Sequence, residues 1–135
     1  MILIDVDGCI SDDRWRLSLV DYSAEDPWHA YHLAAEHDEP ANLHVLTEPA
    51  IALTAMPARY AAIRRSWLRR HAPAVVHVVM RPDDDLSESP ILKHNMLRFV
   101  RSRFPSEPIR AAYDDRADVV SMYRRAGIHA EVLAV

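Results

Sequence analysis

The sequence holds few of the residues that define secreted, fibrous or membrane proteins. It has one cysteine and two glycines. A single cysteine excludes an internal disulfide and a cysteine-rich zinc site, so we expect a reducing, cytoplasmic location. The glycine count excludes collagen-like and linker sequence. No apolar stretch approaches the roughly 18 residues of a membrane span. Because Asp5 and Asp7 interrupt the first apolar run, we expect neither a signal peptide nor a membrane partner.

What the sequence does contain fits one folded domain. The 135 residues are 50% hydrophobic and 27% charged, which is enough to bury a core. The net charge of −4 is uneven, because residues 1–48 carry eleven Asp and Glu against two Arg, whereas the remainder carries fourteen Lys and Arg against nine acids. This asymmetry has two interpretations: a metal site beside an anion-binding surface, or solvated helix faces of different sign.

Short apolar segments alternate with amphipathic ones along the chain. The apolar segments predict five strands, at residues 1–4, 50–54, 74–79, 109–113 and 129–135. The amphipathic segments predict three helices, at residues 57–71, 91–104 and 116–126. This alternation indicates an α/β three-layer sandwich with a mostly parallel, Rossmann-like five-stranded sheet. Residues 9–49 do not alternate, and we expect one or two short helices there, forming a small lid inserted into a single domain of residues 1–135.

Acidic pairs stand where two of the predicted strands end. Asp5 and Asp7 follow the first strand, and Asp114 and Asp115 follow the fourth. Ligands of open parallel sheets collect at this edge, and neighbouring carboxylates there repel one another unless a cation neutralises them. Hard oxygen ligands favour Mg²⁺. The alternative is that each pair only caps a helix or forms a turn, but their joint occurrence favours a metal site.

These residues carry a resemblance to a known family. The segment Asp5-Val6-Asp7-Gly8 after a buried strand resembles the signature of the haloacid-dehalogenase-like (HAD) phosphohydrolase superfamily, and Thr54, Lys93 and Asp114-Asp115 follow in the family's order. Within that superfamily the chain is similar to the phosphatase domain of phage polynucleotide kinase/phosphatases and their stand-alone relatives. Three segments carry this similarity: Asp26-Pro-Trp-His-Ala-Tyr31, Met80-Arg-Pro-Asp83 and Asp114-Asp115-Arg116.

The resemblance implies a two-step reaction on a phosphomonoester. Asp5 is expected to be the nucleophile that forms an aspartyl-phosphate. Asp7 is expected to protonate the leaving group and later to deprotonate water. Mg²⁺ is expected to bind Asp5, the backbone carbonyl of Asp7 and Asp114, with Asp115 as a further or supporting ligand.

Other residues are expected to bind the substrate around this centre. By the resemblance, Thr54 and Lys93 hold the phosphoryl oxygens. Gly8 permits the turn that brings both carboxylates of the signature to one phosphate and lets backbone amides come near it. The further candidates for substrate contact, each with a purely structural alternative, are Arg81, Arg116, Trp28 and Arg59.

The sequence departs from the family at one place. Related phosphatases follow the second-strand Thr with Gly-Arg, but Thr54 is followed by Ala55-Met56, and Arg59 is our candidate for the missing arginine. The predicted helix at 57–71 carries five arginines and no acid, which fits either a track for a nucleic-acid backbone or a solvated face. These arginines are Arg59, Arg64, Arg65, Arg69 and Arg70.

The leading hypothesis from the sequence is a Mg²⁺-dependent phosphomonoesterase that acts on a nucleotide or on a nucleic-acid 3′-phosphate end. Two alternatives stay open: a small-metabolite phosphatase of the same fold, and a non-catalytic partner protein that keeps the fold. The phosphate-binding motif of a kinase, GxxxxGKS or GxxxxGKT, does not occur in the sequence. The sequence predicts no oligomeric state.

Overall fold

A five-stranded parallel sheet forms the centre of the protein. The computed structural model describes residues 1–135. Neighbouring strands all run parallel, in the order β5-β4-β1-β6-β7. The strands are β1 (Ile2–Ile4), β4 (Ala50–Pro57), β5 (Val75–Arg81), β6 (Ala111–Asp114) and β7 (Ala130–Val132). The predicted α/β fold and its five strands are thereby confirmed, although β4 and β5 extend further than predicted.

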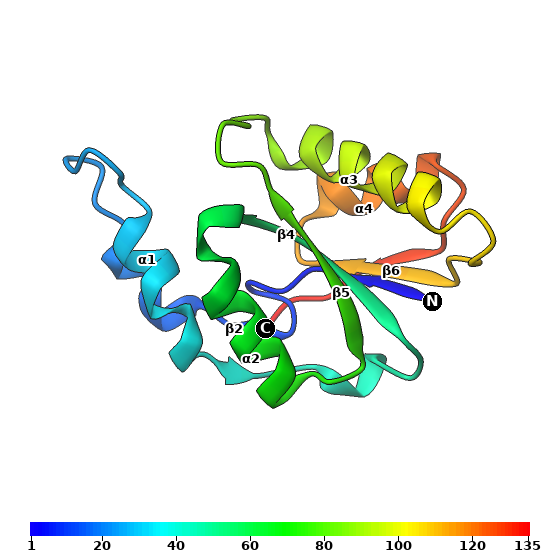
Figure 1. Cartoon of the computed structure of the whole chain (residues 1–135), viewed down its shortest axis with the longest axis horizontal. Coiled ribbons are helices and arrows are strands. Elements are labelled where there is room, and N and C mark those ends of the chain that lie inside the picture. The colour runs from blue at the N-terminus through cyan, green and yellow to red at the C-terminus, as the bar shows by residue number, and fades with distance from the viewer.

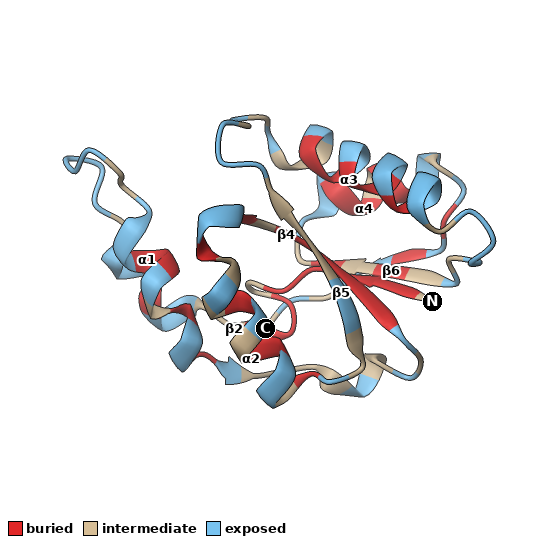
Figure 2. Cartoon of the chain, viewed as in Figure 1, coloured by how far each residue is buried: buried red, intermediate tan, exposed pale blue.

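Three helices cover the two faces of the sheet (Figure 1). Helix α2 (Ala61–His71) lies on one face, and α3 (Ser89–Arg103) and α4 (Ala117–Arg125) lie on the other. Alternate residues of a strand point to opposite faces. Accordingly Ile4 of β1 packs in one core cluster with Trp67 of α2, and Leu3 packs in another with α3 and α4. Each helix therefore buries one side against the sheet and exposes the other (Figure 2).

Local signals in the sequence explain where these helices begin and end. A 3-10 helix, η4 (Ala58–Tyr60), follows Pro57 and delays the start of α2 beyond the predicted residue. Pro90 lies in the first turn of α3, where its missing N–H is not needed. Gly127 follows α4 with φ of 83°, the left-handed conformation expected of a glycine that ends a helix. None of the helices has the length and apolar character needed to cross a lipid bilayer.

Residues 9–49, called the insertion below, connect β1 to β4. They contain helix α1 (His29–Leu33) and an antiparallel pair of two-residue strands, β2 (Ser11–Asp12) and β3 (Glu39–Pro40). Three 3-10 helices complete the insertion: η1 (Arg14–Leu19), η2 (Ala34–His37) and η3 (Leu43–Val45). The sequence predicts only short helices here, because two-residue strands have no detectable periodicity. The part around α1 projects beyond the end of the sheet (Figure 1), and its role as a lid stays a prediction.

Candidate active site

The chain turns sharply where β1 ends, and this turn shapes the site. The carbonyl of Val6 accepts hydrogen bonds from the backbone N–H groups of residues 9–11. Gly8 has a φ of 76°, so the predicted turn is present. A Cβ atom at Gly8 would lie only 2.7 Å from Oδ2 of Asp115. Both the backbone conformation and the lack of space therefore require glycine at this position.

Lys93 is the only lysine of the chain and lies in the second turn of α3. Its side chain reaches two carboxylates at strand ends. Its buried Nζ donates hydrogen bonds to Oδ1 of Asp5 at 2.7 Å and to Oδ2 of Asp114 at 3.0 Å. It also donates to the carbonyl of Leu53. Burial opposes the charge of the ammonium, but the two carboxylates outweigh burial and raise the pKa of Lys93 above its ordinary value. The site thus holds an ammonium that is charged at neutral pH.

Three carboxyl groups lie together beside this ammonium: Asp5, Asp114 and Asp115. Each has an oxygen within 4.8 Å of the others. Burial raises the pKa of Asp5 well above its ordinary value, and burial with the charge of Asp114 raises the pKa of Asp115 to about 6. One ammonium cannot compensate three carboxylates, and all the free donors are hard oxygens. The cluster therefore fits Mg²⁺.

Asp7 lines the same space but has different partners. Its Oδ1 accepts hydrogen bonds from Nη2 of Arg16 and from Nη2 of Arg64, whereas no group of the protein donates to Oδ2. Both guanidinium groups are fully buried. Burial favours the neutral acid, but the charges and hydrogen bonds of Arg64 and Arg16 outweigh it and lower the pKa of Asp7 to about 2. Asp7 is thus a carboxylate at neutral pH, as a general base has to be.

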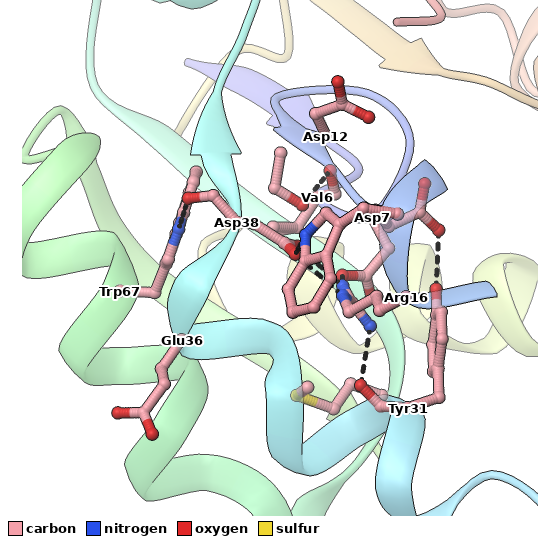
Figure 3. A network of polar contacts seen from close by, with 12 residues as sticks. Val6, Asp7, Asp12, Arg16, Tyr31, Glu36, Asp38 and Trp67 are labelled. Carbon is pink, nitrogen blue, oxygen red and sulfur yellow. Dashed lines mark hydrogen bonds and ion pairs between the residues drawn. The ribbon is translucent and has the colours of Figure 1, made fainter. Parts of the chain in front are cut away.

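Arg16 is held by a network within the insertion (Figure 3). Its Nε and Nη2 donate to the two carboxylate oxygens of Asp38 at 2.8 and 2.7 Å, and its Nη1 donates to the carbonyl of Tyr31 at 3.1 Å. The Tyr31 ring lies 4.0 Å from the guanidinium carbon. The backbone carbonyl of Asp38 in turn accepts a hydrogen bond from the indole of Trp67 in α2. The network therefore ties the insertion both to Asp7 and to the core.

A cavity of about 730 Å³ extends from the strand ends to the insertion, a volume typical of small-molecule sites. Its strand-end side is lined by Asp5, Asp7, Lys93, Asp114, Asp115 and Arg116. Aromatic and apolar residues, among them Trp28, Tyr31, His32 and Met56, line it elsewhere. The Trp28 and Tyr31 rings meet edge to face at 5.1 Å, and Trp28 is 40% exposed. The cavity therefore offers an aromatic surface as well as a charged end.

Thr54 and Arg116 already have partners within the protein. The Thr54 side chain is buried and is not part of the cavity lining, and its Oγ1 accepts the N–H of Met56 at 3.2 Å. Arg116 does line the cavity, but its guanidinium forms two hydrogen bonds to Asp118, at 3.0 and 2.8 Å. Contact with a phosphoryl group stays a prediction for both residues.

Arg81 holds a loop in place. Its Nη1 donates to the backbone carbonyls of Asp85 and Ser87, and its Nε donates to the carbonyl of Ala55. These bonds fix the loop of residues 82–88, whose Asp83 and Asp85 line the cavity. Arg81 also lines the cavity, and its contact with substrate stays a prediction.

Arg59 lines the cavity and already has partners within the protein. Its Nη2 pairs with Oδ2 of Asp26 at 2.9 Å, and its backbone N–H donates to Oδ1 of Asp83. Contact of Arg59 with substrate stays a prediction, and the arginine of α2 that reaches Asp7 is Arg64. Because Arg64 is fully buried, it can belong neither to a nucleic-acid track nor to a solvated face. Arg65 and Arg69, by contrast, are exposed.

Comparisons with known proteins agree with this geometry. The family model of the polynucleotide kinase PNKP phosphatase domain matches residues 1–134. Two similar solved structures are those of the Pnkp1/Rnl/Hen1 RNA repair complex and of the Pnkp1/Rnl/Hen1 complex. The match to the first has 20% sequence identity and a TM-score of 0.70, and it covers 98% of this chain and 42% of the matched chain. The match to the second has 20% sequence identity and a TM-score of 0.71, and it covers 99% of this chain and 46% of the matched chain.

This chain spans less than half the length of the matched chain in each of those two structures, and at their level of identity the likeness establishes the fold. No curated protein matches the chain. The family model, in contrast, covers nearly every residue, including the strand-end carboxylates and Lys93. The chain therefore belongs to the family of polynucleotide kinase PNKP phosphatase domains.

Proposed function

We propose that this protein is a Mg²⁺-dependent phosphomonoester hydrolase that acts on the phosphorylated end of a nucleotide or polynucleotide. The observation that carries the proposal is the joining of Asp5 and Asp114 by the buried ammonium of Lys93, with Asp115 and Asp7 beside them. A buried cluster of this charge is unfavourable for folding alone. It is suited to binding a metal ion and a phosphoryl group.

Asp5 is the nucleophile in this proposal. Its carboxylate attacks phosphorus and the ester oxygen departs, which leaves a phosphoryl group on Asp5; water then hydrolyses this acyl phosphate and regenerates the carboxylate. Lys93, hydrogen-bonded to Oδ1 of Asp5, holds the attacking group in place and offsets charge as the phosphate approaches. Asp5, Asp114 and Asp115 would hold Mg²⁺, which would offset the negative charge of the phosphoryl oxygens.

Asp7 serves both steps as the acid and base. Because its pKa is lowered to about 2, Asp7 is a carboxylate at neutral pH and must gain a proton before it can donate one. A phosphate anion that enters the cavity raises the pKa of Asp7, because like charges favour protonation. After donation Asp7 is again a carboxylate and can accept the proton of the attacking water. Acid–base assistance of this kind is worth roughly 10²- to 10⁴-fold in rate.

The cavity fits a terminal nucleotide as the substrate. With its phosphate at Asp5, the remainder of the ligand extends toward the aromatic side chains of the insertion, where the exposed face of Trp28 can stack on a base. The family, and the RNA repair complexes in which its structural neighbours were seen, support a nucleic-acid end. Trp28 is accordingly the residue we propose for base contact.

A mononucleotide is a second candidate, because the cavity is acidic. Eight aspartates line it against three arginines and one lysine. Four of these aspartates belong to the strand-end side, and the other four, called the acidic rim below, are Asp13, Asp26, Asp83 and Asp85. Such a rim repels the backbone of a longer strand. The two candidates differ in salt dependence. If the substrate is a polynucleotide end, kcat/KM is higher for a 3′-phosphorylated oligonucleotide than for a mononucleotide and falls steeply with salt. If the acidic rim dominates, the mononucleotide is preferred at low salt and the preference shrinks as salt rises.

The proposed activity is tested with Asp5→Asn and p-nitrophenyl phosphate in the presence of Mg²⁺. We expect wild-type protein to release nitrophenolate and Asp5→Asn to release none, while far-UV circular dichroism and cooperative unfolding are retained. The matched control is Asp84→Asn, which removes an exposed carboxylate that makes no side-chain contact, and which should keep full activity. Turnover by Asp5→Asn contradicts the assignment. Lack of turnover by wild-type protein on a panel of phosphomonoesters favours a non-catalytic domain.

A further inference from the structure

Arg64 is a charged residue buried where helix α2 meets the sheet. It is fully buried, together with Trp67 and Leu68 on the same face of the helix. A guanidinium group cannot lose its charge inside a protein, so burying one is unfavourable unless it is paired. The buried guanidinium of Arg64 therefore needs an anionic partner to offset the cost of burial.

The polar contacts of Arg64 are confined to one atom. Its Nη2 donates to Oδ1 of Asp7, and its Nε and Nη1 are buried without any hydrogen-bond partner. Arg16, which donates to the same oxygen, has a full set of other partners in Asp38 and Tyr31. Arg16 would be held in place without Asp7, whereas Asp7 is the single polar partner of Arg64. The polar interactions of Arg64 are therefore directed at Asp7 alone.

Both guanidinium groups meet the same oxygen of Asp7, and this divides the carboxylate into two unlike ends. Oδ1 is saturated by two cationic donors, while Oδ2 accepts no hydrogen bond from the protein. The Asp7 side chain is 16% exposed and lines the cavity. A proton can therefore reside only on Oδ2, since Oδ1 already faces two N–H donors.

We propose that Arg64 is a positioning residue for Asp7: together with Arg16 it holds Oδ1, so that Oδ2 is the oxygen presented to the leaving group and to water. This inference rests on the proposed phosphatase function. The second guanidinium beside Asp7 thus comes from α2, while the first, that of Arg16, comes from the insertion. Arg64 acts through Asp7 and does not itself touch the reacting atoms.

The role predicts a dependence on the leaving group. Nitrophenolate leaves without a proton at neutral pH, whereas the sugar oxygen of a nucleoside 3′-phosphate requires one. In Arg64→Met, we expect kcat/KM for the nucleotide to fall at least tenfold, and kcat/KM for p-nitrophenyl phosphate to change less than about threefold, since it reports only phosphoryl transfer to Asp5. Arg64→Lys, which keeps the charge but not the geometry, should restore part of the nucleotide activity.

A double-mutant cycle separates positioning from a merely structural role. In an Asp7→Asn background, Arg64→Met should cause no further loss of nucleotide turnover, because its effect passes through Asp7. Arg98→Met, an exposed arginine of α3, is the matched control and should leave both substrates unaffected. Each variant is assayed at the same fraction of folded protein, determined by thermal unfolding.

Three outcomes overturn the inference: equal losses on both substrates, unchanged activity on both, or a full further loss in the Asp7→Asn background. If Arg64→Met does not fold, Arg64→Lys is compared on the same two substrates, and an equal loss on both again overturns it. These results differ from failure of the proposed function, in which wild-type protein hydrolyses neither substrate or Asp5→Asn stays active.

Discussion

Replacing Lys93 with methionine tests whether the buried cluster is an electrostatic unit. Methionine keeps the apolar stem but removes the ammonium that bonds Asp5 at 2.7 Å and Asp114 at 3.0 Å. Both carboxylates are buried, at 7% and 1% exposed. Removing one partner of a buried ion pair typically destabilises a protein by about 3–5 kcal/mol. We expect Lys93→Met to lose stability in this range at pH 7.5 without divalent metal.

Two conditions should restore part of this stability. Mg²⁺ replaces the lost positive charge, and at about 100 times its dissociation constant a ligand of the folded state stabilises by about 2.7 kcal/mol. Adding Asp114→Asn removes one of the two uncompensated carboxylates, so the double variant should be more stable than Lys93→Met alone. Urea unfolding with and without Mg²⁺ measures both effects, with Arg98→Met as the control for an exposed position. A loss below about 1 kcal/mol, or one that Mg²⁺ and Asp114→Asn do not change, refutes the reasoning.

Two further predictions concern the metal ligands. Gly8→Ala should weaken Mg²⁺ binding measured by calorimetry, because the added Cβ would lie 2.7 Å from Oδ2 of Asp115. The control is Gly127→Ala: Gly127 has a φ of 83° and nothing within 4 Å, so this variant has only the strain of a positive φ, about 1–2 kcal/mol, and should keep its Mg²⁺ affinity. Equal affinities of the two variants contradict this prediction. The raised pKa of Asp115, about 6, stabilises the metal-free protein at low pH, and this stability is lost as pH rises through 6. Mg²⁺ competes with that proton, so its affinity should fall between pH 7 and pH 5; an affinity that does not change with pH argues against Asp115 as a ligand.

The regular part of the fold could be predicted because each element has a strong local pattern. The apolar run of β1 is short and bounded by a glycine turn, α3 and α4 have amphipathic spacing, and the alternation of strands with helices specifies parallel pairing. The insertion could not be predicted in detail. Its β2 and β3 are two residues each, and 3-10 helices leave no period in so short a stretch. Tertiary contacts, such as the bond from Trp67 to Asp38, determine its course.

The residues of the candidate site that belong to local sequence motifs could be predicted, whereas those that only tertiary structure brings to the site could not. Asp5, Asp7 and the Asp114-Asp115 pair stand at strand ends, so the sheet brings them together. Arg64 lies 57 residues from Asp7 in the sequence, and residue type alone does not distinguish it from the exposed Arg65. Trp67 and Leu68, three and four residues after Arg64, share its face of the helix, and they are the one signal from which its burial could have been predicted.

Trapping the phosphorylated enzyme tests the central claim, that Asp5 is a nucleophile served by Asp7, most directly. In Asp7→Asn, phosphoryl transfer from p-nitrophenyl phosphate needs no acid, but hydrolysis of the aspartyl-phosphate lacks its base. We predict a burst of nitrophenolate stoichiometric with the variant, followed by slow turnover, and a phosphoryl group on Asp5 in acid-quenched protein analysed by mass spectrometry. The burst should be absent from the Asp5→Asn/Asp7→Asn double variant. Steady turnover by Asp7→Asn with no burst and no phosphate on Asp5 would contradict the account.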